Sequence, residues 1–399
     1  MGDLVPSNQH AHNSMIEIKS TKLLILGAGE MQVPIIKKAK DMGAYTIVAD
    51  FDPLALGFSY ADQKLHLSTN DIPALISESK SLQIDGVLTT SDYPVRSVAA
   101  ICNNLKLAGP TTKAADLCTN KYLLREHLLN NEFLVPKFIN IKGPEDLKKI
   151  DFFPCIIKPV DSSGSRGVKK VLSKEGLWDA YQDALKYTHT SSIIAEEFLN
   201  GSEYSVEALT QNSYTSVIAI TEKHVTGDEG MYFVENRHLI PSNLTDSIRN
   251  EIAKLILSLI ESIDLRDSAS HTELMVTEKG IYIIEIGARL GGDYITSHLV
   301  PLANGTDMLE SVINISLKIP VNIKKNNNYH AGIQFITPDN YYKASDFITQ
   351  HREIVIESSL KPFRNVKVLS SFDRLGYFIA RAETREKLID ILNCDYNGN

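Results

Sequence analysis

The first hundred residues alternate between short apolar runs and amphipathic stretches, and this order limits the fold more than any other feature. The predicted strands are residues 22–26, 45–50 and 86–90. The helix after the first strand has one apolar face, made of Met31, Ile35, Ala39 and Met42, and a second helix covers 95–105. Strands that alternate with helices form parallel sheets. We therefore expect an α/β chain that begins with a parallel-sheet domain over residues 21–118.

The length, the net charge and the cysteine spacing of the sequence argue against several classes of protein. A chain of 399 residues is too long for one ordinary core and predicts two or three domains. Its net charge of −8 argues against a nucleic-acid partner, which needs a broad basic surface. No apolar run reaches the ~18 residues that span a membrane. The four cysteines show no metal or disulfide spacing, so we expect a cytoplasmic protein without nucleic-acid or membrane partners.

A hairpin with a three-residue loop at 278–280 is predicted to bring two carboxylates together. The loop ends in a glycine, which supplies the positive φ that such a turn needs. With Thr277 paired to Ile281, Glu273 lies directly opposite Glu285. Like charges destabilise a sheet at the roughly 4.5–5.5 Å between such neighbours, and Mg²⁺ characteristically binds one or two carboxylates plus substrate phosphates. The pair predicts a magnesium site, although a solvated acidic pair explains it equally well in isolation.

A glycine- and serine-rich loop at 161–167 follows the strand that carries Lys158. Successive backbone N–H groups in such a loop can converge on an anion, and Lys158 and Arg166 add positive charge. The loop is not a Walker A motif, because no Gly-Lys-Ser/Thr follows. A flexible hairpin turn fits the loop in isolation. Its position between a lysine-bearing strand and an acidic hairpin favours phosphate binding.

Gly27 and Gly29 follow the first strand, and Asp50 comes about twenty residues later, so the segment partly matches a dinucleotide-binding fingerprint. Gln32 stands where the third glycine is required for close helix–strand packing. The segment therefore favours a Rossmann-like scaffold. An NAD-binding regulatory or dehydrogenase module is the alternative from another class of protein.

Taken in order, these segments resemble the ATP-grasp superfamily of ligases, over essentially the whole chain after residue 20. The matching segments are Lys121 on a helix over 113–130, then 154–167, 195–205, Glu273 and 285–292. Within the superfamily, the chain looks most like the carboxylate–amine ligases that include L-amino-acid (dipeptide) ligases. It is more distantly similar to glycinamide ribonucleotide synthetase and biotin carboxylase.

The resemblance implies an ATP-grasp fold and a division of the chain. The expected parts are a disordered leader over 1–20, a Rossmann-like pre-ATP-grasp domain over 21–118, a central α+β lid subdomain over 119–200, a catalytic subdomain over 201–323 and a small α+β extension packing on it over 324–399. Related ligases are often dimers, so the resemblance also implies a homodimer.

The resemblance assigns binding roles to residues of this sequence. Residues expected to bind ATP are Lys121, Lys158, Ser162, Ser163, Gly164, Ser165, Gly167, Glu196, Glu197, Phe198, Leu199 and Glu203. The lysines would contact the phosphates, 196–199 the adenine and Glu203 the ribose. Glu273 and Glu285 match ligands of Mg²⁺, which Mn²⁺ could replace. Many relatives carry a metal-binding Asn where Gly287 stands, so the number of metal ions stays open.

Three residues are expected to act in the chemistry. Lys158 would neutralise the transferring phosphoryl group, and Arg289 matches the arginine that braces the reacting carboxylate and its tetrahedral intermediate. His271 shares a strand face with Glu273, so it could orient a ligand or the incoming amine; a structural, hydrogen-bonded histidine is the alternative.

The polar segment 223–238 resembles the substrate-facing loop of the amino-acid ligases. Glu235 and His238 are therefore expected to contact substrate, together with Arg289 and Gly292. A solvated surface loop is the alternative for a segment so rich in charge.

The implied reaction joins a small-molecule carboxylate to an amine. The carboxylate attacks the γ-phosphate of ATP to give an acyl phosphate and ADP, and the amine then displaces phosphate. Amino-acid-like substrates are expected. The alternative on the same scaffold is another ATP-grasp reaction, such as phosphoribosyl-amine ligation or a carboxyphosphate-forming step.

Overall fold

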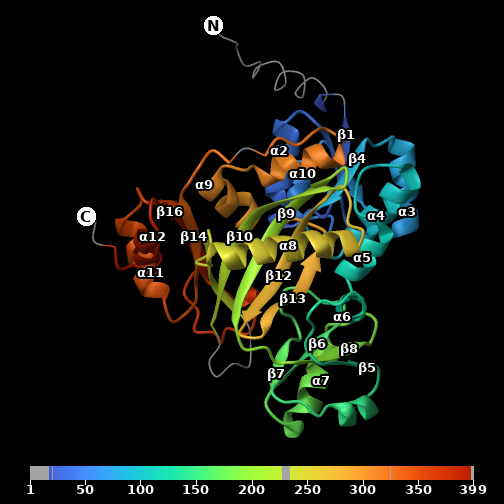
Figure 1. The fold of residues 1–399 in the computed structure, drawn as a ribbon. Helices are drawn as coiled ribbons and strands as arrows, with labels where there is room; N and C mark the ends of the chain where they lie inside the picture. The colour runs from blue at the N-terminus through green and yellow to red at the C-terminus, as the bar shows by residue number, and fades with distance from the viewer. Residues whose placement is uncertain (1–17, 20, 227–233, 324, 397–399) are drawn as a thin grey trace.

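The computed structural model describes residues 18–19, 21–226, 234–323 and 325–396. Most of the expected leader and part of the polar segment 223–238 lie outside the described residues. Three sheets organise the chain: a four-stranded parallel sheet, a second four-stranded sheet and an eight-stranded sheet (Figure 1). The α/β class predicted from the sequence is confirmed.

The N-terminal sheet has the order β3-β2-β1-β4, with all neighbours parallel as predicted. Its strands are β1 (Lys22–Leu26), β2 (Tyr45–Asp50), β3 (Gln63–His66) and β4 (Gly86–Thr89), and its helices are α2 (Val33–Asp41), α3 (Ile72–Leu82) and α4 (Val95–Leu105). The expectation that Met31 lies on the buried helix face is wrong, because Met31 is 47% exposed. Residues 30–32 form a separate 3-10 turn, and α2 begins only at Val33, with Pro34 in its first turn.

The helix predicted over 113–130 is in fact two helices, α5 (Thr112–Cys118) and α6 (Lys121–Asn130). Asn120 separates them, since its side chain accepts hydrogen bonds from the backbone N–H groups of Tyr122 and Leu123. An Asn side chain that caps a new helix competes with continuation of the old one. The break places Lys121 in the first turn of α6, where its backbone N–H donates to Val160 O at 2.8 Å.

The second sheet is antiparallel and has the order β5-β8-β6-β7. Its strands are β5 (Phe138–Ile141), β6 (Cys155–Pro159), β7 (Lys169–Val171) and β8 (Ile193–Glu197), and α7 (Leu177–Leu185) packs on it. We refer to this unit as the lid sheet. It projects from the rest of the molecule, at the lower right of Figure 1.

The large sheet has the order β13-β12-β9-β10-β11-β14-β16-β15. Its strands are β9 (Ser202–Gln211), β10 (Tyr214–Thr226), β11 (Val234–Ile240), β12 (Ser268–Thr277), β13 (Gly280–Gly287), β14 (His330–Ile336), β15 (Val355–Leu360) and β16 (Gly376–Ala382). Its helices are α8 (Asp246–Ser262), α9 (Val300–Asn304), α10 (Met308–Ser316), α11 (Tyr341–Gln350) and α12 (Arg385–Leu392). The C-terminal strands thus continue the sheet beyond β11, where β14 pairs antiparallel along it.

The hairpin of β12 and β13 reaches the predicted carboxylate pairing by a different route. Its loop is one residue shorter than expected, because Thr277 pairs with Gly280 rather than Ile281. A β-bulge between Glu273 and Leu274 then shifts the register back by one residue, and Glu273 lies opposite Glu285. Gly280 keeps the predicted positive φ, at 132°. Bulges redirect side chains next to functional sites, and this one puts both carboxylates on one face.

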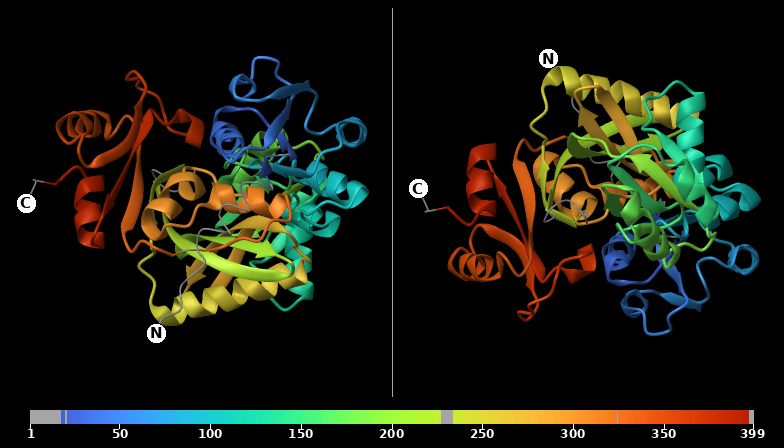
Figure 2. Two further views of the ribbon diagram at one scale, coloured as in Figure 1. Left: turned by 90° about the horizontal axis from the view of Figure 1, so that it is seen from above. Right: turned by 90° about the horizontal axis from the view of Figure 1, so that it is seen from below.

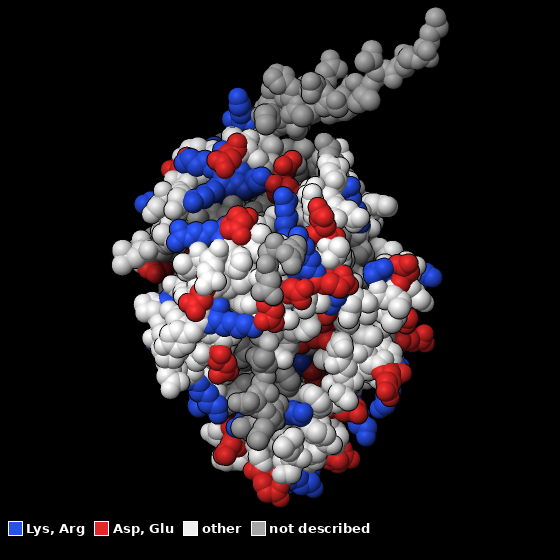
Figure 3. Space-filling model, turned by 90° about the vertical axis from the view of Figure 1, so that its left-hand side faces the viewer, with Lys and Arg blue, Asp and Glu red and all other residues white. Residues whose placement is uncertain are grey.

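The C-terminal elements lie next to the N-terminal domain in both views of Figure 2, and residues of both line one cavity together with residues 290–298. Basic and acidic side chains are interspersed over the face that carries the C-terminal elements (Figure 3). Among the residues that the structure describes, no helix has the length and apolar character needed to span a bilayer.

Candidate active site

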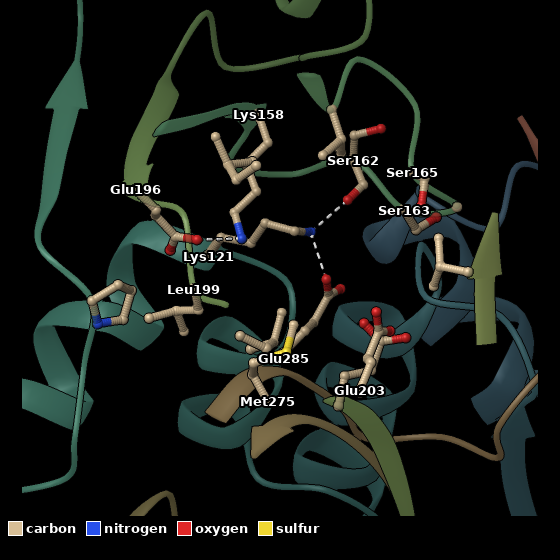
Figure 4. A pocket seen from close by; sticks show the side chains of 18 of the residues that line it. Lys121, Lys158, Ser162, Ser163, Ser165, Glu196, Leu199, Glu203, Met275 and Glu285 are labelled. Atoms are coloured by element: carbon tan, nitrogen blue, oxygen red, sulfur yellow. Dashed lines mark hydrogen bonds and ion pairs between the residues drawn. The ribbon is translucent and has the colours of Figure 1, made fainter. Parts of the chain in front are cut away.

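A cavity between the lid sheet and the large sheet gathers most of the residues singled out in the sequence (Figure 4). α6 and the lid sheet with its loops contribute Lys121, Lys158, Ser162, Ser163, Gly164, Ser165, Glu196, Glu197, Phe198 and Leu199. The large sheet and the segment after it contribute Glu203, Glu235, His271, Glu273, Glu285, Gly287 and Arg289. Segments far apart in the sequence therefore meet at one place.

Lys121 links the glycine- and serine-rich loop to the acidic hairpin. Its Nζ lies 2.6 Å from Ser162 O and 3.0 Å from Glu285 Oε2 (Figure 4). Burial alone would lower the pKa of Lys121, but the Glu285 carboxylate outweighs burial and raises it. Lys121 therefore stays an ammonium in the cavity, which is the form that attracts phosphate.

Lys158 and Arg125 hold the buried carboxylate of Glu196 from two sides. Lys158 Nζ lies 2.5 Å from Oε2, and Arg125 Nε lies 2.6 Å from Oε1. Burial would raise the pKa of Glu196, but Arg125 and then Lys158 reverse the effect and lower it to about 2. Burial also lowers the pKa of Lys158 itself.

Sequence reasoning missed Arg125, although its position four residues after Lys121 puts it on the same helix face. The Arg125 side chain is fully buried. Its two terminal nitrogens each donate at 2.8 Å to backbone carbonyls of β13, those of Ile283 and Ile284. Arg125 thus joins α6, the lid sheet and the acidic hairpin.

Lys223 on β10 is a second missed cation, and three carboxylates surround it. Its Nζ lies 2.6 Å from Glu203, 2.7 Å from Glu273 and 3.5 Å from Glu235. Burial would lower the pKa of Lys223, but Glu203 and Glu273 raise it well above its usual range. The sequence placed Lys223 in a polar loop, and only the pairing of β10 with β9 brings it opposite Glu203.

The donor set at Glu273 and Glu285 fits a magnesium ion. Within the described ranges, no group of three or more His, Cys, Asp or Glu side chains could hold an ion. Two carboxylates suffice for Mg²⁺ when phosphate oxygens complete its shell. The contacts with Lys223 and Lys121 use one oxygen of each carboxylate, Oε1 of Glu273 and Oε2 of Glu285. A side chain at Gly287 would approach Asp92 Oδ1 at 3.3 Å, so glycine there leaves room for Asp92.

His271 pairs with a buried carboxylate that sequence reasoning did not identify. Its Nδ1 lies 2.6 Å from Glu207 Oε1, and its Nε2 lies 3.6 Å from Glu273 Oε1. Burial would lower the pKa of His271, but Glu207 raises it to about 9. Glu207 lies four residues after Glu203, and strand alternation puts both on one face of β9.

Arg289 forms a two-point contact with Asp92, which follows β4 in the N-terminal domain. Its Nε lies 2.7 Å from Oδ1 and its terminal nitrogen 3.0 Å from Oδ2. Burial would lower the pKa of Arg289, but Asp92 raises it. Asp92 sits beyond the carboxyl end of a parallel strand, where α/β sheets place their ligand-binding residues.

Some predicted residues occupy other places. Glu235 lines the cavity, but Arg374 of the C-terminal segment holds it at 2.9 Å. His238 is 1% exposed, with its Nε2 3.5 Å from Asp293, and burial lowers its pKa. Gly292 lines a different cavity.

Two further expectations can be placed. Gly167, at φ 71°, packs against Tyr187 and Pro159. In the first β–α turn, the Gln32 side chain lies beside Gly27, and Ala28 N donates to Asp50 at 2.7 Å. A bound dinucleotide would need the Ala28 N–H and the Asp50 carboxylate, and these two groups instead bond to each other.

Comparison with known proteins identifies a domain family that the chain matches and solved structures with a similar fold. Residues 151–297 match the ATP-grasp domain family. The chain is 25% identical over 311 residues to a formate-dependent phosphoribosylglycinamide formyltransferase of Prochlorococcus marinus, covering 73% of this chain and 72% of the relative. It is 22% identical over 352 residues to alanine–anticapsin ligase of Bacillus subtilis, covering 80% and 73%. The crystal structure of an L-amino acid ligase from Bacillus licheniformis superposes with a TM-score of 0.77 at 20% identity, covering 94% of this chain and 96% of that one.

Proposed function

We propose that this ATP-grasp protein is an ATP-dependent carboxylate–amine ligase that forms an amide bond through an acyl phosphate. The observation that carries the proposal is one cavity with Lys121, Lys158 and the 162–165 loop on one side and Glu273 and Glu285 on the other. Cations and backbone amides suit a triphosphate, and the paired carboxylates suit its metal ion. Amino-acid-like substrates fit the similarity to the amino acid ligases.

The nucleotide would be held from both walls of the cavity. Mg²⁺ bound by Glu273 and Glu285, or Mn²⁺ in its place, would offset charge on the triphosphate. Lys121 and Lys158 would contact phosphate oxygens, and the loop over 161–167 would close on them.

The adenine base and the ribose of ATP would lie in the same cavity, at the end away from the residues that contact the phosphates. The backbone N–H groups of Glu197 and Phe198 donate to Lys137 O and Pro154 O, so we assign the contact with adenine to Leu199. Glu203 accepts from Lys223 through Oε1, and we assign its second oxygen to the ribose hydroxyls.

In the first step, an oxygen of the substrate carboxylate bonds to the γ-phosphorus, and the bond to the β-phosphate oxygen breaks with release of ADP. Charge compensation on the transferring group matters most in such a step. Lys158 is suited to it because burial removes competing water.

In the second step, the amine nitrogen bonds to the acyl carbon, and phosphate leaves with the electron pair of the broken C–O bond. Arg289 would stabilise the developing oxyanion. His271, oriented by Glu207, would direct the amine, and the proton that the amine loses passes to the departing phosphate.

The substrates, the cellular location and the oligomeric state are proposed on the same reasoning. The substrates are small molecules, and the net charge of −8 makes nucleic acid an unsuitable partner. A cytoplasmic homodimer is proposed by likeness to related ligases. The domain division given above is proposed with it.

The alternative reaction on this fold is phosphoribosyl-amine ligation or a carboxyphosphate-forming step. The similarity to the phosphoribosylglycinamide formyltransferase favours it. Its substrate would bring a phosphate group into the protein beside Arg289.

Hydroxylamine trapping tests the proposal without knowledge of the amine. The protein is incubated with Mg-ATP, hydroxylamine and single carboxylates, since an acyl phosphate reacts with hydroxylamine to give a hydroxamate. We expect hydroxamate and ADP in equal amounts with at least one amino-acid-like carboxylate. Lys158→Ala should abolish both products while the protein stays folded, and Lys174→Ala, an exposed lysine on the same subdomain, should leave both unchanged. Formation of ADP without hydroxamate from every carboxylate would contradict an acyl-phosphate mechanism.

A further inference from the structure

A second cavity lies between the N-terminal domain, the segment after Arg289 and the C-terminal strands. The first β–α turn contributes Glu30, the segment after β13 contributes Gly292, Tyr294 and His298, and the C-terminal strands contribute Glu357 and Tyr377. Three parts of the chain that are distant in sequence therefore build this cavity together.

A short glycine-containing segment runs from the candidate active site into the wall of this cavity. Arg289 lines the first cavity, and Leu290, Gly291 and Gly292 line the second. An added Cβ at Gly292 would meet no heavy atom within 4 Å. The lining of the second cavity therefore begins at the residue directly after the arginine assigned to the acyl group.

The wall at Gly291 is backed by the buried pair of Glu207 and His271. A Cβ at Gly291 would lie 2.7 Å from Glu207 Oε2 and 2.7 Å from His271 Nδ1. Glu207 is fully buried, and its Oε2 has no hydrogen-bond partner among the described residues. The Gly291 backbone therefore passes directly over this buried pair, and any larger residue there would collide with both side chains.

Aliphatic side chains are the most numerous in the lining of the second cavity, and two carboxylates and two tyrosine rings lie among them. Glu357 accepts from Tyr377 Oη at 2.6 Å and lies 2.8 Å from His298 Nε2. The rings of Tyr294 and Tyr377 stack with centroids 4.3 Å apart. Glu30, from the first β–α turn, also lines the cavity and is exposed. Carboxylates beside aromatic faces attract cations and repel anions.

The cationic side chains near this cavity are directed elsewhere. Lys37 lines it, but its Nζ lies 4.3 Å from the ring centroid of Tyr60, which is not part of the lining. Arg374 is held by Glu235 at 2.9 Å and by Asp293 at 2.8 Å. A phosphate or carboxylate in the second cavity would therefore meet more negative than positive charge.

We propose that the second cavity binds the amine substrate, and that this amine carries neither phosphate nor a free carboxylate. The acceptor is a neutral or cationic amine with an apolar or aromatic body, rather than an amino acid or a phosphoribosyl amine. This assignment rests on the proposed function, because it names the second substrate of the same ligase.

Three probes that share one skeleton test the assignment by binding alone. Tyramine, L-tyrosine and O-phospho-L-tyrosine carry the same aryl-ethylamine with no, one and two anionic groups. Calorimetry on the full chain should show tyramine binding at least tenfold more tightly than L-tyrosine, with the phosphorylated probe weakest. Cadaverine against L-lysine repeats the comparison without the aromatic ring. Equal affinity within both sets, or tighter binding of the anionic members, would overturn the proposal.

A competition between the amine and hydroxylamine for the acyl phosphate tests whether the amine binds in the second cavity. Hydroxylamine is too small to need the cavity, so the ratio of amide to hydroxamate reports amine binding apart from the first step. Gly292→Leu should lower this ratio at least tenfold by filling the cavity, and Glu357→Gln should reduce the discrimination between tyramine and L-tyrosine. Glu353→Gln, an exposed change on the same segment, is the matched control.

The outcomes separate the two proposals. An unchanged ratio in Gly292→Leu, or unchanged discrimination in Glu357→Gln, refutes the second cavity while the ligase function stands. Absence of hydroxamate from the unmodified protein with every carboxylate refutes the ligase function, and the calorimetric comparison then decides the cavity by itself.

Discussion

Arg289 and Asp92 are 197 residues apart in the sequence, yet their side chains meet through two hydrogen bonds of 2.7 Å and 3.0 Å. One residue follows the last strand of the acidic hairpin, and the other follows β4 of the N-terminal sheet. The pair fixes the guanidinium at the boundary between the two cavities. It also ties the segment after β13 to the N-terminal domain.

Replacement of Arg289 by Ala should separate nucleotide binding from ligation. We expect ATP affinity to stay within about twofold, because Arg289 is assigned to the acyl group, while amide formation falls by roughly 10²–10³, as for loss of one oxyanion donor. Nucleotide titration and product formation measure the two effects. Asp92→Asn should give a smaller loss, since it keeps the shape of the partner. A parallel loss of ATP affinity in Arg289→Ala would show that the arginine serves the nucleotide.

Glu285→Gln should abolish metal-dependent chemistry. The amide keeps the size of the side chain but removes the charge that a divalent ion requires. We expect ADP formation to fall by at least about 10²-fold, and Mn²⁺ bound in the presence of a non-hydrolysable ATP analogue, followed by electron paramagnetic resonance, to decrease. Glu278→Gln, on the exposed turn of the same hairpin, should change neither quantity. Normal Mn²⁺ binding by Glu285→Gln would remove the basis for the metal site.

Arg125→Met should lower the stability of the whole protein. The substitution leaves the Glu196 carboxylate in a buried site with Lys158 as its remaining partner, and loss of one member of a buried ion pair costs about 3–5 kcal/mol. Urea unfolding at pH 7 measures the change. Arg266→Met provides the contrast, because Arg266 pairs with Asp264 in an exposed position, where a pair contributes about 1 kcal/mol or less. Similar effects of both substitutions would argue against a structural role for Arg125.

The low pKa of Glu196 predicts how stability depends on acid. Its folded pKa is about 2 against a reference of 4.5, so the carboxylate stabilises the protein above pH 4.5, and this contribution disappears as the pH falls toward 2. Glu196→Gln removes the contribution at neutral pH. The difference in unfolding free energy between the original protein and Glu196→Gln should therefore shrink as the pH drops through this window. A difference that stays constant down to pH 3 would mean that Glu196 is not held as a stabilising carboxylate.

The sequence predicted local elements well and their long-range contacts poorly. The strand at 45–50 and the helix at 95–105 were located from the sequence pattern, and the structure confirms their bounds. Asn120 was overlooked as a helix cap, because the apolar stripe of Leu117, Leu124 and Leu128 continues across it. Periodicity does not register a break when the two helices keep the same buried face.

For the hairpin, the sequence predicted the correct pairing of the two carboxylates but the wrong length of the turn. The loop was expected to contain three residues, whereas Thr277 pairs with Gly280 and a bulge at Glu273 restores the register. No local rule places a bulge in advance. Glu273 lies opposite Glu285 only because the shorter turn and the bulge cancel.

The missed residues of the candidate site share one property. Arg125, Glu207, Lys223 and Asp92 each act through a partner on another element, and nothing within a few residues of them indicates that partner. Strand order decides these contacts: Lys223 meets Glu203 because β10 pairs with β9. Residue type and spacing could nominate Glu273 and Glu285, but the cations that balance them required the fold.

The hydrogen bonding of β14 along β11 has a consequence for any attempt to shorten this protein. A chain that stopped before residue 330 would leave the β11 edge unpaired, and an open edge recruits strands from other molecules. Such a fragment would also lose Arg374, so Glu235 and Asp293 would each lose the cationic partner that lies nearest to them, at 2.9 Å and 2.8 Å. The last segment is therefore not a removable appendage, and recombination between relatives must exchange it together with the strands that bear the acidic residues.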